Sequence, residues 1–381
     1  MILIVRVTLR EIVLPLAEPF RTATGIAENR RIVLLEIDGD GGTVWTECVA
    51  GAVPEYSRES VEGAWDILVG SIIPDLFERP FEDPAAVHTE LKREFSRWPM
   101  ARAAIEMGSW ALAANKQEKS LASLLAGFST VTSEPKSSIP AGVVIGLTTD
   151  ADDLIRRTLT AVADGYQRIK LKISPDSDIA SIRRVSEIAG KSLAVDANGS
   201  FSIRDKTHLR MLEELDELGL SMIEQPFGAR AMKAHATLQK MLDTPICLDE
   251  SISDLSSVEA MINLGSGRIV NLKPGRVGGF TEAIAIHDRC ASEGIPVWCG
   301  GMLETGIGRA YNVALASLPG FTLPGDLSPS RRYWQRDVIT RPWTMTPDGF
   351  LEVPLGQSGP GVEVDTAFID ELTVSMLSIM A

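Results

Sequence analysis

Five short stretches decide the fold of this chain, beginning with Arg-Ile-Lys-Leu-Lys at residues 168–172. Each is an apolar run that ends in a charged residue. The other four are Leu-Ala-Val-Asp-Ala-Asn (193–198), Met-Ile-Glu-Gln-Pro (222–226), Ile-Cys-Leu-Asp-Glu-Ser (246–251) and Ile-Val-Asn-Leu-Lys-Pro-Gly (269–275). The charges follow at intervals of 24, 28, 25 and 24 residues, in the order Lys172, Asp196, Glu224, Asp249 and Lys273. Amphipathic segments of helical length separate the runs, so the pattern predicts a repeated βα unit.

Three more strands complete the pattern, and we expect them at 141–147, 296–299 and 321–323. Eight parallel strands joined by helices favour a closed (β/α)8 barrel over an open sheet. No glycine-rich nucleotide-binding loop follows any of these strands, so the sequence gives no support for a nucleotide-binding fold.

The charged ends of the strands predict a metal site. In a barrel, groups at the C-terminal ends of the strands converge on one place. Asp196, Glu224 and Asp249 would repel one another there unless a cation balanced them. Oxygen ligands suit a hard ion, so we expect Mg²⁺, with Mn²⁺ or another divalent ion as alternatives.

The two terminal lysines predict acid–base chemistry. Strands two and six of an eight-stranded barrel lie opposite each other, so Lys172 and Lys273 should face each other across the mouth. A carboxylate substrate between them could lose and regain its α-proton, with the metal stabilising the enediolate. Lys170 should point the same way as Lys172, and its like charge should lower the pKa of Lys172.

Each of these charges also has an ordinary explanation when it is taken alone. A lysine can lie on a barrel rim, and an aspartate can cap a helix. The regular repetition at the same end of successive strands favours a site instead. We expect no histidine base, because all four histidines fall in helical segments or at their edges: His88, His208, His235 and His287.

Composition restricts the function further. The chain has 381 residues, 45% of them hydrophobic, and a net charge of −14, which argues against nucleic acid and anionic membranes as partners. Residues 1–16 lack a signal-peptide core, and no apolar run is long enough to span a bilayer. The four cysteines have no CxxC spacing and fit buried free thiols. We therefore expect a cytoplasmic protein that acts on a small-molecule carboxylate. We also expect a homo-oligomer, although nothing in the composition indicates the oligomeric state.

The chain outside the barrel predicts a second domain. Asp-Gly-Asp-Gly-Gly at 38–42 indicates a hairpin, an alternating strand precedes it, and helices should follow at 61–72, from Asp83-Pro84, and at 101–115. We expect an α+β capping domain (1–130), a barrel (131–326) and a C-terminal segment (327–381) that returns to the cap.

With these five stretches, the chain resembles the enolase superfamily, in its muconate-lactonising-enzyme subgroup. Within that subgroup it most resembles the o-succinylbenzoate synthase/N-succinylamino acid racemase family. Beyond the five stretches, the matching motifs are Trp45-Thr46-Glu47-Cys48-Val49-Ala50, Lys273-Pro274-Gly275-Arg276-Val277-Gly278-Gly279, residues 296–306 (PVWCGGMLETG) and Leu323-Pro324-Gly325-Asp326.

The resemblance implies a modified (β/α)7β TIM barrel beneath an α+β cap, with the last helix displaced. It implies Mg²⁺ at Asp196, Glu224 and Asp249, and Lys172 and Lys273 as the acid–base pair. In dehydration, a step of menaquinone biosynthesis, Lys172 would remove the α-proton and return it to the leaving hydroxide. In racemisation both lysines would exchange protons. The implied substrate contacts are Lys170, Asn198, Gly301, Met302 and Leu303, with a loop at 20–25 that closes over them.

Three departures from the family pattern stand out. Val144 occupies a position where family members often have Ser, which removes a polar contact to the substrate. Trp110-Ala111-Leu112 replaces Trp-Asp-Leu, and Phe201 replaces the more frequent Tyr. None of these affects the five central charges.

Other functions stay open on the sequence alone. Muconate cycloisomerase belongs to the same subgroup, as does dipeptide epimerase, although Asp326-Leu327-Ser328 lacks the epimerase Asp-x-Asp. A Schiff-base lysine aldolase would need no metal and would leave the three acids unexplained. A non-catalytic barrel would show no metal dependence.

Overall fold

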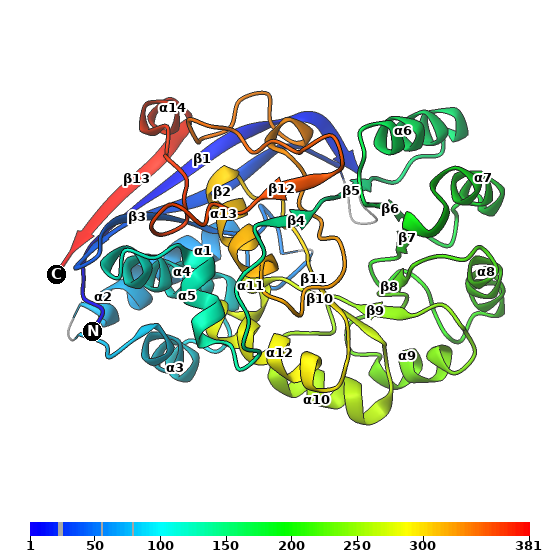
Figure 1. The fold of residues 1–381 in the computed structure, drawn as a ribbon, viewed down its shortest axis with the longest axis horizontal. Coiled ribbons are helices and arrows are strands. Elements are labelled where there is room, and N and C mark those ends of the chain that lie inside the picture. The colour runs from blue at the N-terminus through cyan, green and yellow to red at the C-terminus, as the bar shows by residue number, and fades with distance from the viewer. Residues whose placement is uncertain (22–25, 55, 78–79) are drawn as a thin grey trace.

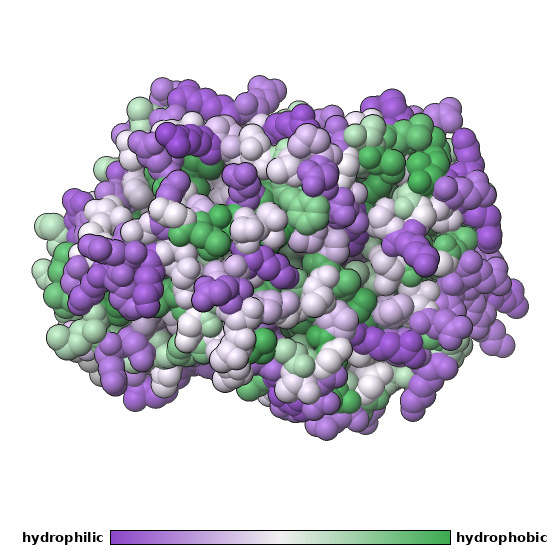
Figure 2. Space-filling model, in the orientation of Figure 1, coloured by the Kyte–Doolittle hydropathy of each residue, from purple (hydrophilic) through white to green (hydrophobic). Residues whose placement is uncertain are grey.

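The computed structural model describes residues 1–21, 26–54, 56–77 and 80–381. Figure 1 shows an antiparallel sheet with its helices on one side, and a curled parallel sheet ringed by helices on the other. Hydrophilic side chains cover most of the face shown in Figure 2. In the described ranges, no helix combines the length and apolarity needed to cross a membrane.

The cap is built on a four-stranded antiparallel sheet of order β13-β1-β2-β3. The strands are β1 (Ile4–Arg21), β2 (Ile26–Gly39), β3 (Gly42–Cys48) and β13 (Thr373–Met380). The predicted hairpin is confirmed, since Gly39 pairs with Gly42 across a two-residue turn. β13 comes from the far end of the sequence and pairs with β1. The domain boundaries at 130 and 326 stay predictions.

The helices of the cap follow its strands, as predicted. They are α1 (Val61–Ile67), a π-helical turn (Leu68–Ile72), α2 (Ile73–Leu76), α3 (Pro84–Glu94), α4 (Pro99–Lys116) and α5 (Leu121–Phe128). Asp83 caps α3 by accepting the N–H of Ala86, and Pro84 occupies the first turn. α5 was not predicted.

The barrel strands form a seven-stranded parallel sheet in chain order. They are β5 (Gly142–Ile145), β6 (Arg168–Lys172), β7 (Leu193–Asp196), β8 (Ile223–Glu224), β9 (Ile246–Leu248), β10 (Ile269–Leu272) and β11 (Val297–Cys299). The five stretches of the sequence are therefore β6 to β10. The first strand is shorter than the predicted 141–147.

Helices lie around the outside of this sheet (Figure 1). They are α6 (Ala151–Ala163), α7 (Ile179–Ala189), α8 (Lys206–Asp216), α9 (Met232–Gln239), α10 (Leu255–Leu264), α11 (Pro274–Val277), α12 (Phe280–Ser292) and α13 (Gly306–Ala316). The four histidines lie on α3, α8, α9 and α12, which confirms their predicted helical placement. All four cysteines are free and buried, as predicted.

The eighth strand, predicted at 321–323, does not form as a strand. Instead Phe321 makes a single bridge to Val297, and Gly325 makes one to Ala141. Pro324 between them has no N–H and cannot continue a ladder. The segment still joins β11 to the start of β5, so it closes the barrel between its first and last strands. A short antiparallel pair, β4 (Ser138–Pro140) with β12 (Phe350–Glu352), lies beside this closure.

Carboxylates of the cap satisfy the N-termini of barrel helices. Glu106 on α4 accepts the N–H of Phe280 at 2.7 Å, and the N–H and Oγ1 of Thr281 at 2.9 and 2.6 Å. The first N–H groups of a helix have no intrahelical partner, so α12 depends on this carboxylate. Glu47 on β3 makes a similar contact to Thr305, just before α13.

Glu106→Ala should therefore destabilise the fold. It removes the acceptor of four donors, the N–H of Phe280, the N–H and hydroxyl of Thr281 and the indole N–H of Trp110. We expect this loss to cost about 2–3 kcal/mol of unfolding free energy. Urea unfolding measures this, with Glu94→Ala on the exposed face of α3 as the control. Equal stability of the two variants would contradict the role of Glu106.

Candidate functional site

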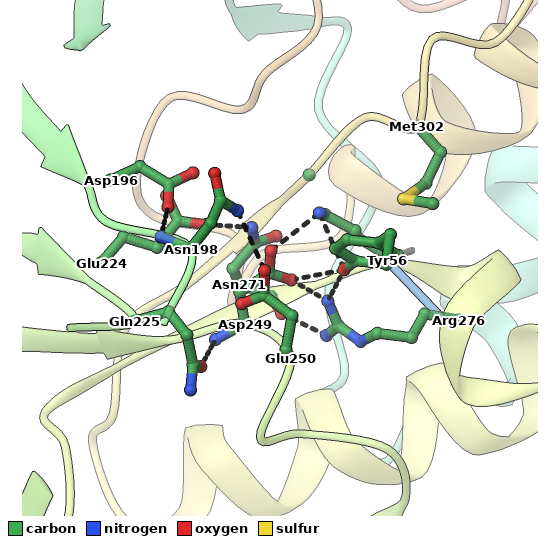
Figure 3. Close-up of polar contacts among 12 residues, drawn as sticks. Tyr56, Asp196, Asn198, Glu224, Gln225, Asp249, Glu250, Asn271, Arg276 and Met302 are labelled. Atoms are coloured by element: carbon green, nitrogen blue, oxygen red, sulfur yellow. Dashed lines mark hydrogen bonds and ion pairs between the residues drawn. The ribbon is translucent and has the colours of Figure 1, made fainter. Parts of the chain in front are cut away.

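The strand register brings three of the predicted residues side by side. Lys172 pairs with Asp196, and Asp196 pairs with Glu224, at the C-terminal ends of β6, β7 and β8. Asp249 follows β9 and Lys273 follows β10. Figure 3 shows the three carboxylates near one another at this end of the sheet. The sequence pattern therefore placed these groups at one site.

Lys172 lies at one end of the carboxylate row. Its Nζ is 2.7 Å from Asp196 Oδ2 and 2.6 Å from Asn198 Oδ1. The Nδ2 of Asn198 donates in turn to Glu250 at 2.9 Å. Asn198 therefore holds the amine of Lys172 on one side and the half-buried carboxylate of Glu250 on the other.

Lys273 lies at the other end of the row. Its Nζ is 2.8 Å from Asp249 Oδ2 and 3.0 Å from the hydroxyl of Tyr56, which belongs to the cap. The Tyr56 hydroxyl also donates to Asp249 Oδ1 at 3.0 Å, and Arg276 makes a close ion pair with the same oxygen. Burial lowers the pKa of Lys273, but the charges of Tyr56, Glu250 and Glu224 outweigh it, so the net shift is upward.

Lys170 lies beneath the carboxylates and is only 2% exposed. Its Nζ is 2.6 Å from Asp326, 2.7 Å from Glu224 and 3.2 Å from Asp196. Burial lowers the pKa of Lys170, but the charges of the three carboxylates raise it by more. The net shift of the pKa is upward, so the ammonium stays charged. Its charge is shared among them, which compensates much of the repulsion that we expected it to exert on Lys172. Its predicted contact with substrate stays a prediction.

Strained backbone surrounds the site. Among the described residues, four that are not glycine have positive φ, and three of these follow barrel strands directly or closely: Asn198 (43°), Gln225 (40°) and Leu303 (59°). Such conformations cost of order 1–3 kcal/mol each and persist where the surroundings hold them. Gln225 is held by both ends of its amide, which contacts Phe227, Asp249 and Ser251.

A pocket opens beside the lysines. It is lined by Val144, Lys170, Lys172, Lys273, Gly301, Leu303, Glu304, Arg309, Asp326 and Tyr333. Gly301 and Leu303 thus lie where a substrate contact was predicted, and Met302 donates its N–H to Glu304 at 2.8 Å. Val144 presents an apolar side chain here. The predicted loop at 20–25 falls largely outside the described residues.

Five residues complete the site without having been predicted for it: Tyr56, Glu250, Asn271, Arg276 and Asp326. Glu250, Arg276 and Asp326 stand in motifs that carry the family resemblance, so the motifs held a signal for them. Asn271 donates to Glu224 at 2.7 Å from inside β10. Tyr56 comes from the cap, and nothing in its sequence neighbourhood marks it.

The donor set fits a hard divalent cation. As the side chains stand, no three His, Cys, Asp or Glu groups in the described parts of the chain are arranged to hold a metal. Each acid is instead paired with a cation: Asp196 with Lys172, Glu224 with Lys170 and Asp249 with Lys273. The three acids lie at the ends of adjacent strands, which run about 4.8 Å apart, so rotamer changes can converge their oxygens on one ion.

Comparison with known proteins identifies the class. Residues 153–368 match the family "Enolase C-terminal domain-like", and residues 4–126 match "Mandelate racemase / muconate lactonizing enzyme, N-terminal domain". A solved structure of an enolase superfamily member from Listeria innocua superposes with a TM-score of 0.92, at 36% identity over the whole of both chains. The fold and the matched families place the chain in the enolase superfamily, which confirms the predicted class.

Sequence relatives narrow this to one family. The o-succinylbenzoate synthase of Geobacillus kaustophilus is 42% identical over 96% of this chain and 95% of its own length. The N-succinylamino acid racemase of an Amycolatopsis species is 42% identical over 98% of both. The chain belongs to the o-succinylbenzoate synthase/N-succinylamino acid racemase family of the muconate-lactonising subgroup.

A more distant solved structure has the same fold. The dipeptide epimerase of Cytophaga hutchinsonii was solved as a complex with Mg and a dipeptide. It superposes with a TM-score of 0.88 over 99% of this chain, at 21% identity, and so supports the fold alone.

We expect Mg²⁺ to stabilise the protein. A ligand that binds only the folded state, at a hundredfold above its Kd, adds about 3 kcal/mol to the unfolding free energy. Thermal unfolding of EDTA-treated protein with and without MgCl₂ measures this. Asp249→Asn should weaken the stabilisation, whereas Asp205→Asn, which alters only the exposed cap of α8, should retain it. A missing Mg²⁺ response in the wild type would refute the metal site.

Proposed function

We propose that the protein abstracts the proton α to a substrate carboxylate, with a divalent ion at Asp196, Glu224 and Asp249. One observation carries this proposal. Two lysine amines lie at the two ends of a row of three acids, Lys172 at Asp196 and Lys273 at Asp249. This arrangement supports the proposal of one proton-transferring group on each side of a substrate held at the row.

The chain's own groups divide the work. A Mg²⁺ ion, when bound, would neutralise the acids and the charge that develops on the substrate carboxylate. With the acids so engaged, Lys172 would be released from Asp196 to take up the α-proton, and Asn198 would orient its amine. Lys273, near Tyr56, would face the opposite side of the substrate as a cation or as the second acid–base group.

The reaction we propose is o-succinylbenzoate synthesis by dehydration, N-succinylamino acid racemisation, or both. The names of the relatives support these two above other family reactions. In dehydration, Lys172 removes the α-proton and returns it to the leaving hydroxide, so the products are the aromatic acid and water. In racemisation, one lysine removes the proton and the other delivers one to the opposite face. The same lysines would serve both reactions.

The remaining assignments are also proposals. We propose Lys170, Asn198, Gly301, Met302 and Leu303 as substrate contacts. We further propose that the protein works as a cytoplasmic homo-oligomer on small carboxylates. Muconate cycloisomerisation and dipeptide epimerisation are the alternatives within the subgroup. A Schiff-base aldolase and a non-catalytic barrel have no observation in their favour.

The test of function is a direct assay. Purified protein with Mg²⁺ should convert the cyclohexadiene precursor of o-succinylbenzoate, or racemise members of an N-succinylamino acid panel. EDTA should abolish the activity and Mg²⁺ should restore it. Turnover only of muconate or dipeptides would replace the proposed reaction, and activity that survives EDTA would overturn the proposed chemistry.

The lysines should differ in which face of the substrate they serve. In deuterated solvent, Lys273→Ala should exchange the α-proton of one enantiomer of an N-succinylamino acid, and Lys172→Ala that of the other. Each variant should lose about 10²–10⁴-fold in racemisation, as expected for loss of an acid–base group. Exchange of both enantiomers by one variant would contradict the opposed arrangement.

A further inference from the structure

Leu303 forms part of the pocket wall in a conformation that leucine rarely adopts. Its φ is 59°, in the left-handed region, and its side chain lines the pocket. A leucine there is strained and needs neighbours that hold it. The surrounding contacts therefore decide the shape of this wall.

Two buried carboxylates hold the backbone on either side of Leu303. The Oε2 of Glu304 accepts the N–H of Met302 at 2.8 Å, just before it. The Oε2 of Glu47 accepts the N–H of Thr305 at 3.0 Å and its hydroxyl at 2.7 Å, just after it. Glu304 is fixed in turn by Asn312, which donates to its Oε1 at 2.8 Å.

These two carboxylates come from different parts of the fold. Glu304 belongs to the barrel, whereas Glu47 lies on β3 of the cap and is only 1% exposed. They lie against the same helix turn. A Cβ on Gly308 would be 2.8 Å from Glu47 Oε2 and 2.9 Å from Glu304 Cβ, so only glycine fits there.

The environment of Glu47 is unusual for a purely structural acceptor. Its second oxygen, Oε1, is buried without a hydrogen-bond partner. Burial and the neighbouring Glu304 raise its pKa to about 7, against the opposing charge of Arg30. A neutral amide at this position would therefore be tolerated while still accepting from Thr305.

We propose that Glu47 is a positioning residue for the substrate, which holds the strained Leu303 turn of the pocket wall from the cap. It acts through Thr305 and does not itself line the pocket. The inference rests on the proposed function insofar as this pocket is the substrate site. It gives the cap a defined part in setting the affinity for substrate.

The matched control is Glu106, the other carboxylate of the cap that satisfies a barrel helix. Glu106 caps α12 at Phe280 and Thr281, neither of which lines the pocket. Glu47→Ala and Glu106→Ala both remove such an acceptor and should both lower the melting temperature. Only Glu47→Ala should raise KM, by about tenfold or more, with kcat changed about threefold or less. Glu47→Gln should stay within about threefold of the wild type in both constants.

A double-mutant cycle tests the link to strain. Leu303→Gly removes the cost of positive φ, so the turn no longer depends on Glu47. The rise in KM caused by Glu47→Ala should then shrink to about threefold or less in the Leu303→Gly background. An equal rise in both backgrounds would overturn the proposal, as would Glu47→Ala and Glu106→Ala giving the same KM.

A crystal structure separates this inference from the proposed function. If the wild type turns over none of the substrates named above, the proposed function fails. The φ of Leu303 in Glu47→Ala then decides the inference alone. A turn that relaxes to negative φ supports it, and an unchanged Leu303 refutes it.

Discussion

The site depends on charge compensation inside the barrel. Three acids at the ends of adjacent strands are almost fully buried, and a buried carboxylate is tolerated only when it is paired. Each therefore has a cationic partner, and Lys170 serves two of them from below. This arrangement lets the acids exist together before any metal arrives. It also explains why lysines, with long flexible stems, stand at both ends of the row: they can leave an acid without disturbing the strands.

Buried carboxylates also join the cap to the barrel, here by accepting hydrogen bonds at the ends of helices. Helices α12 and α13 begin beneath the cap, and their first N–H groups need acceptors. Glu106 accepts N–H groups at the start of α12, and Glu47 accepts the N–H of Thr305, the N-cap residue of α13. The two parts of the fold therefore meet through charged hydrogen bonds at helix ends. Tyr56 adds a third contact, to Lys273 and Asp249. The candidate site is therefore built by both parts of the fold.

Much of this was predictable from sequence, for a definite reason. β6 to β10 are short and buried, and each ends in a charge or is followed directly by one, so the spacing alone predicted both the strands and the row of charges at their ends. The prediction of the eighth strand was wrong because Pro324 has no backbone N–H to donate to a strand ladder. The apolar pattern of the sequence does not show this loss. Helix α5 is short and almost entirely apolar, and such a run cannot be told from a buried strand by its pattern alone. Tyr56 was missed because no local signal tells which loop of one domain will reach the other. The ion pair between Lys170 and Asp326 could not be predicted, because only the closure of the barrel brings these two residues together.

The closure between β11 and β5 has a mechanical consequence. Elsewhere in the barrel, neighbouring strands are joined by ladders of backbone hydrogen bonds. Between β11 and β5, two isolated bridges through residues 321–325 replace such a ladder. Across this seam, Asp326 bonds Arg168 and Lys170 through side chains alone. Side-chain contacts resist sliding less than a ladder of backbone hydrogen bonds does. We therefore expect the barrel to be least rigid at this closure. Because Gly301 and Leu303 border that closure, we expect any change in the girth of the barrel to fall where the pocket opens and not in the arc from β6 to β10.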